Sequence, residues 1–167
     1  MVPNLKEPYG KKTCRRLSDL GEYFADRKAV DEILSRGDLV VYEVYEHPVP
    51  QEGKHLIFAT TVLFAGKVGD EFHFTKGHFH SRPDGAEVIV GMEGAGMVLL
   101  QDRAGRFRQE RLEACSVVYS PPGWAHRTVN TSKEDLIFLS ICRADVGHDY
   151  DTITTKGFAK RVVDKGD

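Results

Sequence analysis

The sequence predicts an all-β protein: a single barrel of short strands, preceded by a short helical and irregular extension. Runs rich in valine, isoleucine, phenylalanine and tyrosine recur along most of the 167 residues, as the strands of a barrel or sandwich do. Turn residues separate these runs, and no helical pattern alternates with them as parallel βαβ units would require. No linker, repeat or low-complexity segment divides the chain. We therefore expect one domain, with the extension at residues 1–37 and the barrel at residues 38–167.

The extension contains the best helix candidate, at residues 27–36. Asp26 can accept hydrogen bonds from the first turn of this helix, and Gly37 can end it. Apolar side chains recur along it at helical spacing and predict one buried face. They are Val30, Ile33 and Leu34.

The barrel segment is predicted to form its strands from runs of β-branched, aromatic and other apolar residues. In chain order the predicted strands are residues 39–46, 56–64, 72–80, 86–92, 97–101, 107–111, 116–120, 127–130, 136–142 and 158–163. Glycine and proline favour turns because their backbone preferences differ from those of a strand. Segments that contain them occupy 65–66, 83–85, 94–96, 104–105 and 121–123, and these segments separate the runs.

Composition excludes several classes of function. A net charge of −2 provides no basic surface for nucleic acid. No run approaches the roughly 18 apolar residues that a membrane span needs, and the N-terminus lacks the apolar core of a signal peptide. Cys14, Cys115 and Cys142 are an odd number of cysteines at unrelated spacings, which argues against a disulfide framework and suits a reducing compartment. We expect a cytoplasmic protein that binds neither nucleic acid nor membranes.

A pair of histidines indicates a metal site. His78 and His80 are two residues apart on the predicted strand 72–80, so both imidazoles point to the same face. Glu87 opens the returning strand and can come alongside them, and His126 arrives from a separate hairpin. A lone His-x-His pair is more often surface decoration, so the prediction depends on Glu87 and His126 as well.

Three imidazoles and one carboxylate form a donor set that suits Fe, Ni, Mn, Co or Zn. Four protein ligands leave positions free only on a metal that accepts five or six ligands. We therefore expect one divalent transition metal per chain, with Fe first and Mn or Ni next, in preference to a closed tetrahedral zinc site.

Two segments resemble the two motifs of the cupin superfamily. The first is Gly77-His78-Phe79-His80, followed by Glu87 and Gly94, and the second is Pro121-Pro122-Gly123-Trp124-Ala125-His126, followed by Asn130. Two departures stand out: six residues separate His80 from Glu87, and Cys115 stands where the second motif normally begins with glycine. The longer gap is similar to that of the archaeal-type, cupin glucose-6-phosphate isomerases.

The likeness to this isomerase family extends over roughly residues 40 to 163. It is carried by segments 75–80, 86–87, 118–119, 124–130, 147–150, 152–153 and 156–158. The resemblance implies a jelly-roll β-barrel and a metal-dependent, cytoplasmic homodimer that interconverts glucose 6-phosphate and fructose 6-phosphate. It also implies roles for individual residues. The implied metal ligands are His78, His80, Glu87 and His126; the implied catalytic residues are Glu87, His148 and Tyr150; the implied phosphate-binding residues are Tyr42, Thr61, Thr75 and Gly77.

The chain departs from this family at positions expected to touch substrate. Gly123, Ile89 and Cys142 stand where the family tends to have tyrosine. Arg143 is a hypothetical replacement for the lost donors, because a guanidinium binds phosphate bidentately. Strand alternation places Lys76 on the face opposite Thr75 and Gly77, so we expect a solvated lysine. The remaining histidines are interpreted as structural or exposed: His47, His55 and His73.

Several alternatives stay open. The isomerisation can proceed through an enediol, with Glu87 as general base, or by a direct hydride shift in which Glu87 only balances charge. The same ligands also suit another metal-dependent cupin enzyme, such as a dioxygenase or a different sugar isomerase. A third possibility is a non-catalytic cupin that binds sugar phosphates. The native metal, the sugar preference and the dimer geometry are not determined by these patterns.

Overall fold

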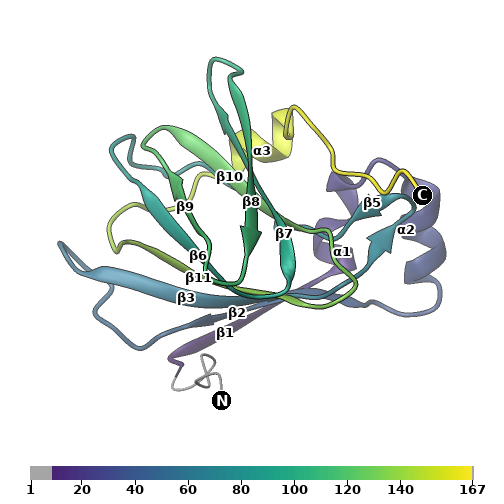
Figure 1. Cartoon of the computed structure of the whole chain (residues 1–167), viewed down its shortest axis with the longest axis horizontal. Coiled ribbons are helices and arrows are strands. Elements are labelled where there is room, and N and C mark those ends of the chain that lie inside the picture. The colour runs from purple at the N-terminus through teal and green to yellow at the C-terminus, as the bar shows by residue number, and fades with distance from the viewer. Residues whose placement is uncertain (1–8, 167) are drawn as a thin grey trace.

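The computed structural model describes residues 9–166, which form a β-barrel with short helices at its rim (Figure 1). The strands are β1 (Lys11–Arg16), β2 (Val40–Glu46), β3 (Leu56–Leu63), β4 (Lys67–Val68), β5 (Glu71–Phe72), β6 (Glu87–Glu93), β7 (Ala95–Asp102), β8 (Phe107–Glu113), β9 (Val117–Ser120), β10 (Trp124–Asn130) and β11 (Leu136–Arg143). The helices are α1 (Leu17–Leu20), the 3₁₀ helix η1 (Gly21–Tyr23), α2 (Arg27–Leu34) and α3 (Asp151–Lys156). Within the described residues, no helix is both long and apolar enough to cross a membrane.

Two antiparallel sheets build the barrel. The larger has the strand order β1-β2-β3-β11-β6-β9, and the smaller has the order β10-β7-β8. Ile89 of β6, Leu99 of β7 and Leu136 of β11 belong to the core that the sheets enclose. Helices α1 and α2 cover one end of the barrel (Figure 1) and add Leu17 and Val30 to this core. The prediction of an all-β barrel is confirmed.

Most predicted elements are present. Predicted strands 39–46, 56–64, 86–92, 97–101, 107–111, 116–120, 127–130 and 136–142 correspond to β2, β3, β6, β7, β8, β9, β10 and β11, with ends shifted by no more than three residues. The predicted helix is α2, and Asp26 Oδ1 accepts a 2.9 Å hydrogen bond from the backbone N–H of Ala29. This cap is the one expected from the sequence.

The predicted strand 72–80 is wrong. Strand β5 ends at Phe72, and beyond it only Phe74, His78 and Phe79 make single bridges to other segments. Gly77 has a φ of +75°, in the left-handed region that interrupts a strand. The segment therefore makes only isolated bridges to β10, at Phe74 and His78, and Phe79 then bridges to Asp149.

The predicted strand 158–163 is also wrong, since only Val163 makes a bridge there, to Glu71. Side chains hold this segment instead: Phe158 packs against the core, and Arg161 Nη1 lies 2.9 Å from a Glu71 oxygen. Residues 158–163 therefore pack over the barrel through their side chains and do not form a strand.

Strand β1 was missed by the sequence patterns. Its residues, Lys-Lys-Thr-Cys-Arg-Arg, are mostly basic and lack the apolar alternation that predicts a strand. It forms because it pairs antiparallel with β2, placing Arg15 opposite Tyr42 and Lys11 opposite Glu46. The six-stranded sheet thus takes its edge strand from the segment expected to be a helical and irregular extension.

Candidate active site

A cavity of about 560 Å³ opens inside the barrel and is lined by three of the predicted metal ligands, His78, Glu87 and His126. Its walls come from β1, β2, β3, β6, β10 and β11, from residues 75–78, and from the loop before α3. Polar and charged side chains from distant parts of the sequence face this one space. Such a concave, mixed polar and apolar space is typical of a small-molecule site.

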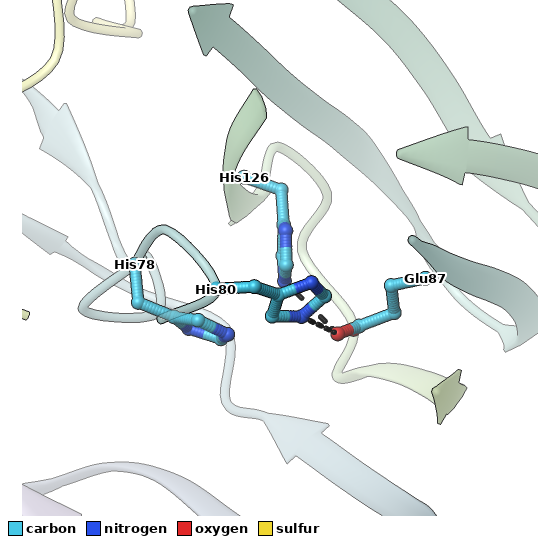
Figure 2. A group of neighbouring side chains, drawn as sticks. All are labelled: His78, His80, Glu87 and His126. Carbon is cyan, nitrogen blue, oxygen red and sulfur yellow. Dashed lines mark hydrogen bonds and ion pairs between the residues drawn. The ribbon is translucent and has the colours of Figure 1, made fainter. Parts of the chain in front are cut away.

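The four predicted ligand side chains converge in this part of the barrel. His78, His80, Glu87 and His126 each offer one donor atom, and the four atoms lie within 4.8 Å of one another. The Nε2 atoms of His80 and His126 lie 3.2 and 3.3 Å from Glu87 Oε2, as the dashed lines in Figure 2 show. The imidazole of His78 points toward the same centre from the opposite side (Figure 2).

Local backbone geometry brings the ligands together. His78 and His126 form a backbone bridge in which each N–H donates to the other's carbonyl, at 3.3 and 3.2 Å. The glycine before His78 permits this close approach, because a Cβ on Gly77 would lie 2.9 Å from the carbonyl oxygen of His126. Glu87 is the first residue of β6 and pairs with Ser120 of β9, which brings it beside β10.

Burial and mutual charge set the protonation of these groups. Burial opposes ionisation of Glu87, but the charges and hydrogen bonds of His126 and His80 outweigh it and hold the pKa of Glu87 well below its usual value. Burial, with the nearby His126, lowers the pKa of His78 well below its usual value. At neutral pH Glu87 is therefore ionised and His78 is neutral, which are the forms that bind a metal.

The donor set fits a divalent transition metal. His78 Nε2 is buried and has no hydrogen-bond partner among the described residues, and such an orphaned polar atom is costly unless something binds it. Outer groups fix the other rings: Ser120 Oγ lies 3.3 Å from His126 Nδ1, and the pKa of His80 reflects a hydrogen bond with the Gly85 backbone. These contacts point the Nε2 atoms at the centre, as the outer shell of a metal site does.

His148 and Tyr150 line the same cavity beside the metal-ligand group. The ring centroid of His148 lies 4.3 Å from that of His78, and the rings of His148 and Tyr150 stack at 5.7 Å. Burial lowers the pKa of His148 and raises the pKa of Tyr150. Two backbone hydrogen bonds between Phe79 and Asp149 tie their loop to the segment that bears His78 and His80.

The predicted phosphate-binding residues also face the cavity: Tyr42, Thr61, Thr75 and Gly77. The hydroxyl of Tyr42 accepts a 3.4 Å hydrogen bond from the Lys76 N–H, and burial raises the pKa of Tyr42 to about 12. Thr75 Oγ1 accepts a 3.0 Å hydrogen bond from the Thr128 N–H, which leaves its proton to donate. These hydroxyls suit an anionic ligand.

The structure places Arg143, the hypothetical phosphate ligand, outside the cavity lining. Its neighbours Cys142 and Ala144 line the cavity, but Arg143 does not. Its guanidinium lies 2.7 Å from Asp145 and 3.3 Å from Asp84. Because successive side chains of a strand point to opposite faces, Cys142 and Ala144 face the cavity and Arg143 faces away from it.

The expectation that Lys76 lies on the face opposite Thr75 and Gly77 is wrong, because all three residues line the cavity. Lys76 lines the cavity, and its Nζ lies 5.2 Å from the centroid of the Tyr23 ring and 5.0 Å from that of Tyr150. The expectation assumed regular alternation through residues 72–80, and Gly77 breaks that alternation. Lys76 is thus a cavity residue that strand geometry could not identify.

Three further cavity residues come from β1. Lys11, Thr13 and Arg15 are two residues apart and line the cavity on one face of the strand. Their two-residue spacing is the spacing of side chains on one face of a strand. The basic sequence of this segment, however, does not predict that it pairs with β2. The remaining histidines lie outside this group: His47 stacks on Phe58, His55 is exposed and His73 is buried against the carbonyl of Phe64.

Comparison with known proteins gives a consistent result. A family model described as glucose-6-phosphate isomerase matches residues 14–167. The glucose-6-phosphate isomerase of Pyrococcus abyssi is 51% identical over 158 residues, which cover 95% of this chain and 84% of that protein. The enzyme of the same name from Pyrococcus horikoshii is 53% identical over 155 residues, which cover 93% and 82%. A Bacillus subtilis oxalate decarboxylase structure matches at 22% identity with a TM-score of 0.51, over 64% of this chain and 26% of that one, which shows a shared cupin fold alone.

Proposed function

The chain belongs to the glucose-6-phosphate isomerase family, and from this we propose that it interconverts glucose 6-phosphate and fructose 6-phosphate. The observation that carries the proposal is the convergence of four metal-binding donors, three of which line a cavity large enough for a sugar phosphate. Family membership supplies the reaction, and the cavity supplies the residues for it.

The proposed metal ligands are His78, His80, Glu87 and His126, with Fe first among Fe, Ni, Mn, Co and Zn. A divalent metal bound there supplies Lewis-acid stabilisation for the negative charge that develops on the substrate oxygens. His80 and His126 are oriented by their hydrogen bonds with the Gly85 backbone and Ser120. Their rings therefore need no rearrangement to bind.

Proton handling is assigned to the chain's own side chains. Aldose–ketose isomerisation moves hydrogen between C1 and C2 and protons between the two adjacent oxygens. Glu87 is held ionised and His148 is held neutral, so each has a free site for a proton at neutral pH. Tyr150 keeps its proton, because burial raises its pKa, and its hydroxyl can donate a hydrogen bond to the sugar.

Two routes remain for the hydrogen itself. If Glu87 or His148 takes the proton from carbon, an enediol forms and the proton can exchange with solvent. If hydrogen passes directly between C1 and C2, no base takes it and exchange does not occur. Isomerisation in deuterated water separates the routes, because deuterium at C1 or C2 of the product supports the enediol.

The central test is fructose 6-phosphate turnover by chelator-stripped protein before and after addition of Fe, Ni, Mn, Co or Zn. We expect activity to return with at least one metal. His80→Ala is the matched variant, and it should lose bound metal and activity together. Absence of turnover with all five metals would overturn the isomerase assignment, whereas full metal content in His80→Ala would overturn the ligand set.

A homodimer is proposed for the assembly. Val117 and Tyr119 on the edge strand β9 are 65% and 57% exposed, and they alternate with the inward-facing Val118 and Ser120. Val88 of β6 extends this outward apolar surface, since it pairs with Tyr119. Exposed apolar patches of this kind mark protein interfaces. Light scattering should give twice the chain mass, and Val117→Glu should shift the protein toward the monomer.

A cytoplasmic location is proposed as well. Cys14, Cys115 and Cys142 are free thiols, and free cysteines suit a reducing compartment. The sugar phosphates of the proposed reaction are charged molecules that do not cross membranes unaided.

A further inference from the structure

The cavity contains more positive charge than the metal-ligand group explains. Its lining includes three basic residues, Lys11, Arg15 and Lys76, none of which belongs to the metal-ligand group. Lys11 is neutralised, because its Nζ lies 3.2 Å from Glu46 of the paired strand. Arg15 and Lys76 form no ion pair with any acidic side chain of residues 9–166.

Arg15 is positioned by strand pairing. It stands opposite Tyr42 in the β1–β2 register, on the face of β1 that also presents Lys11 and Thr13 to the cavity. It lies close enough to Tyr42 to oppose the rise in the pKa of that residue, and its positive charge also acts on Tyr150. Arg15 is partly buried, and its guanidinium carries five N–H donors.

Lys76 is positioned by the backbone and by two aromatic rings. Arg127 Nη2 donates a 2.9 Å hydrogen bond to the Lys76 carbonyl, and the Lys76 N–H donates to the Tyr42 hydroxyl. Its ammonium lies about equally far from the rings of Tyr23 and Tyr150, at 5.2 and 5.0 Å. Aromatic faces stabilise a cation but take none of its hydrogen bonds in the way a carboxylate does.

Tyr42 therefore joins the two cations. Arg15 is its partner in the strand register, and the backbone N–H of Lys76 donates to its hydroxyl, so both residues lie at the same end of the cavity. Two unpaired cations in a half-buried space repel each other, and an anion placed between them removes this cost. Neutral hydroxyls around them add donors and no negative charge.

We propose that Arg15 and Lys76 are the cationic phosphate ligands of the sugar phosphate, with Arg15 as the bidentate one. This inference rests on the proposed function, because that function supplies a phosphorylated substrate. It assigns recognition of the phosphate dianion to an N-terminal strand and to the residue before Gly77. Discrimination between a sugar phosphate and the free sugar then depends on these two side chains.

The test measures binding of sorbitol 6-phosphate, a non-reacting sugar phosphate, to metal-loaded full-length protein by calorimetry. Arg15→Gln and Lys76→Gln should each weaken binding about tenfold or more, since a hydrogen bond to a charged group contributes about 1.5–3 kcal/mol. The matched controls are Arg111→Gln and Lys28→Gln, whose side chains are 74% and 89% exposed and lie outside the cavity. Metal content should be equal in all four variants.

Kinetics provide a second readout. Both cavity variants should raise KM for fructose 6-phosphate by a similar factor while kcat changes less than about threefold, because the phosphate is carried on C6 and the reaction takes place at C1 and C2. Loss of less than threefold in sorbitol 6-phosphate affinity, relative to the controls, would overturn the proposal. If Arg15→Gln does not fold by circular dichroism, Arg15→Lys decides: it keeps the charge but loses the planar pair of donors. Unchanged affinity in Arg15→Lys would exclude the bidentate role.

The outcomes for the two proposals are separable. If the wild-type protein turns over no fructose 6-phosphate with any metal but Arg15→Gln still weakens sorbitol 6-phosphate binding, the isomerase assignment fails and the phosphate site stands. If turnover is normal and both cavity variants bind like their controls, only the phosphate site fails.

Discussion

The histidines of the cavity differ in pKa because each has different neighbours. Burial, with the nearby His126, pushes the pKa of His78 far down, and burial lowers that of His148. Burial also disfavours the charged form of His80, but its hydrogen bond with Glu87 outweighs this and raises its pKa. Two chemically identical side chains, two residues apart, thus have pKa values shifted in opposite directions. The hydrogen bond with Glu87 is the largest contribution that raises the pKa of His80.

Ser120 is expected to tune metal affinity without touching the metal. Its hydroxyl lies 3.3 Å from His126 Nδ1 and orients the ring. Ser120→Ala should weaken metal binding about tenfold, which is the lower end of the roughly 10- to 100-fold loss typical when a metal ligand loses its hydrogen-bond partner. Competition with a chromogenic chelator measures the affinity, and Ser35→Ala, at the exposed end of α2, is the control. Equal affinities in the two variants would assign Ser120 no role.

Gly77 and Gly123 form a matched pair for backbone strain. Both have positive φ, +75° and +77°, but only at Gly77 would a Cβ collide, 2.7 Å from Phe158 and 2.9 Å from the His126 carbonyl. Gly123→Ala should cost about 1 kcal/mol of unfolding free energy from backbone strain alone. Gly77→Ala should cost about 3 kcal/mol, because overpacking adds to the strain. Urea denaturation measures both, and equal losses would contradict the close approach of Gly77 to β10.

At the scale of elements, two loops carry the chemistry and are tied together. The loop between His80 and Glu87 donates two backbone hydrogen bonds to the loop before α3: Arg82 N–H to Val146 O and Ser81 N–H to Gly147 O. Side chains reinforce this contact, since Asp145 lies 3.4 Å from Arg82 and 2.7 Å from Arg143. The loop bearing His148 therefore keeps a defined position relative to the metal ligands.

Arg143 is expected to stabilise this loop contact and not to bind substrate. Arg143→Gln should leave KM for fructose 6-phosphate within about twofold of wild type, while unfolding free energy falls by about 0.5 kcal/mol, as for other exposed ion pairs. Steady-state kinetics and thermal melting measure the two quantities. A tenfold rise in KM for Arg143→Gln would show that Arg143 does contribute to phosphate binding.

At the scale of the whole molecule, the proposed metal links segments that are far apart in sequence. His78 and His80 come from the segment after β5, Glu87 from β6 and His126 from β10, which belong to both sheets. A ligand that binds only the folded barrel stabilises it by mass action. The metal site is therefore expected to couple binding to the stability of the entire barrel.

Chelation provides the test of this coupling. Removal of metal should lower Tm, and metal at 100 times its Kd should restore about 2.7 kcal/mol of stability. Differential scanning calorimetry measures the change. His80→Ala should melt at one temperature with or without added metal. A shift in this variant equal to that of wild type would place the stabilising metal elsewhere.

The sequence determined the elements whose own side chains specify them. Apolar runs bounded by turn residues predicted most strands, and a cap residue with an apolar stripe predicted α2. The proposed metal ligands were found from the two-residue spacing of His78 and His80 together with Glu87 and His126 in segments that resemble the cupin motifs, and the structure brings all four together. The strands and the helix are specified by neighbouring residues, and the metal ligands belong to residue types that commonly bind metals.

Only the tertiary structure decided which charged side chains face the cavity. Arg15 does so because a basic strand pairs with β2, and that pairing leaves no pattern within β1 itself. Lys76 turns inward and Arg143 outward, against the predictions, because the first depends on the backbone angle at Gly77 and the second on the alternation of β11. The direction of a charged side chain depends on the path of the backbone and on which strands pair. The identity of the residue determines neither of these.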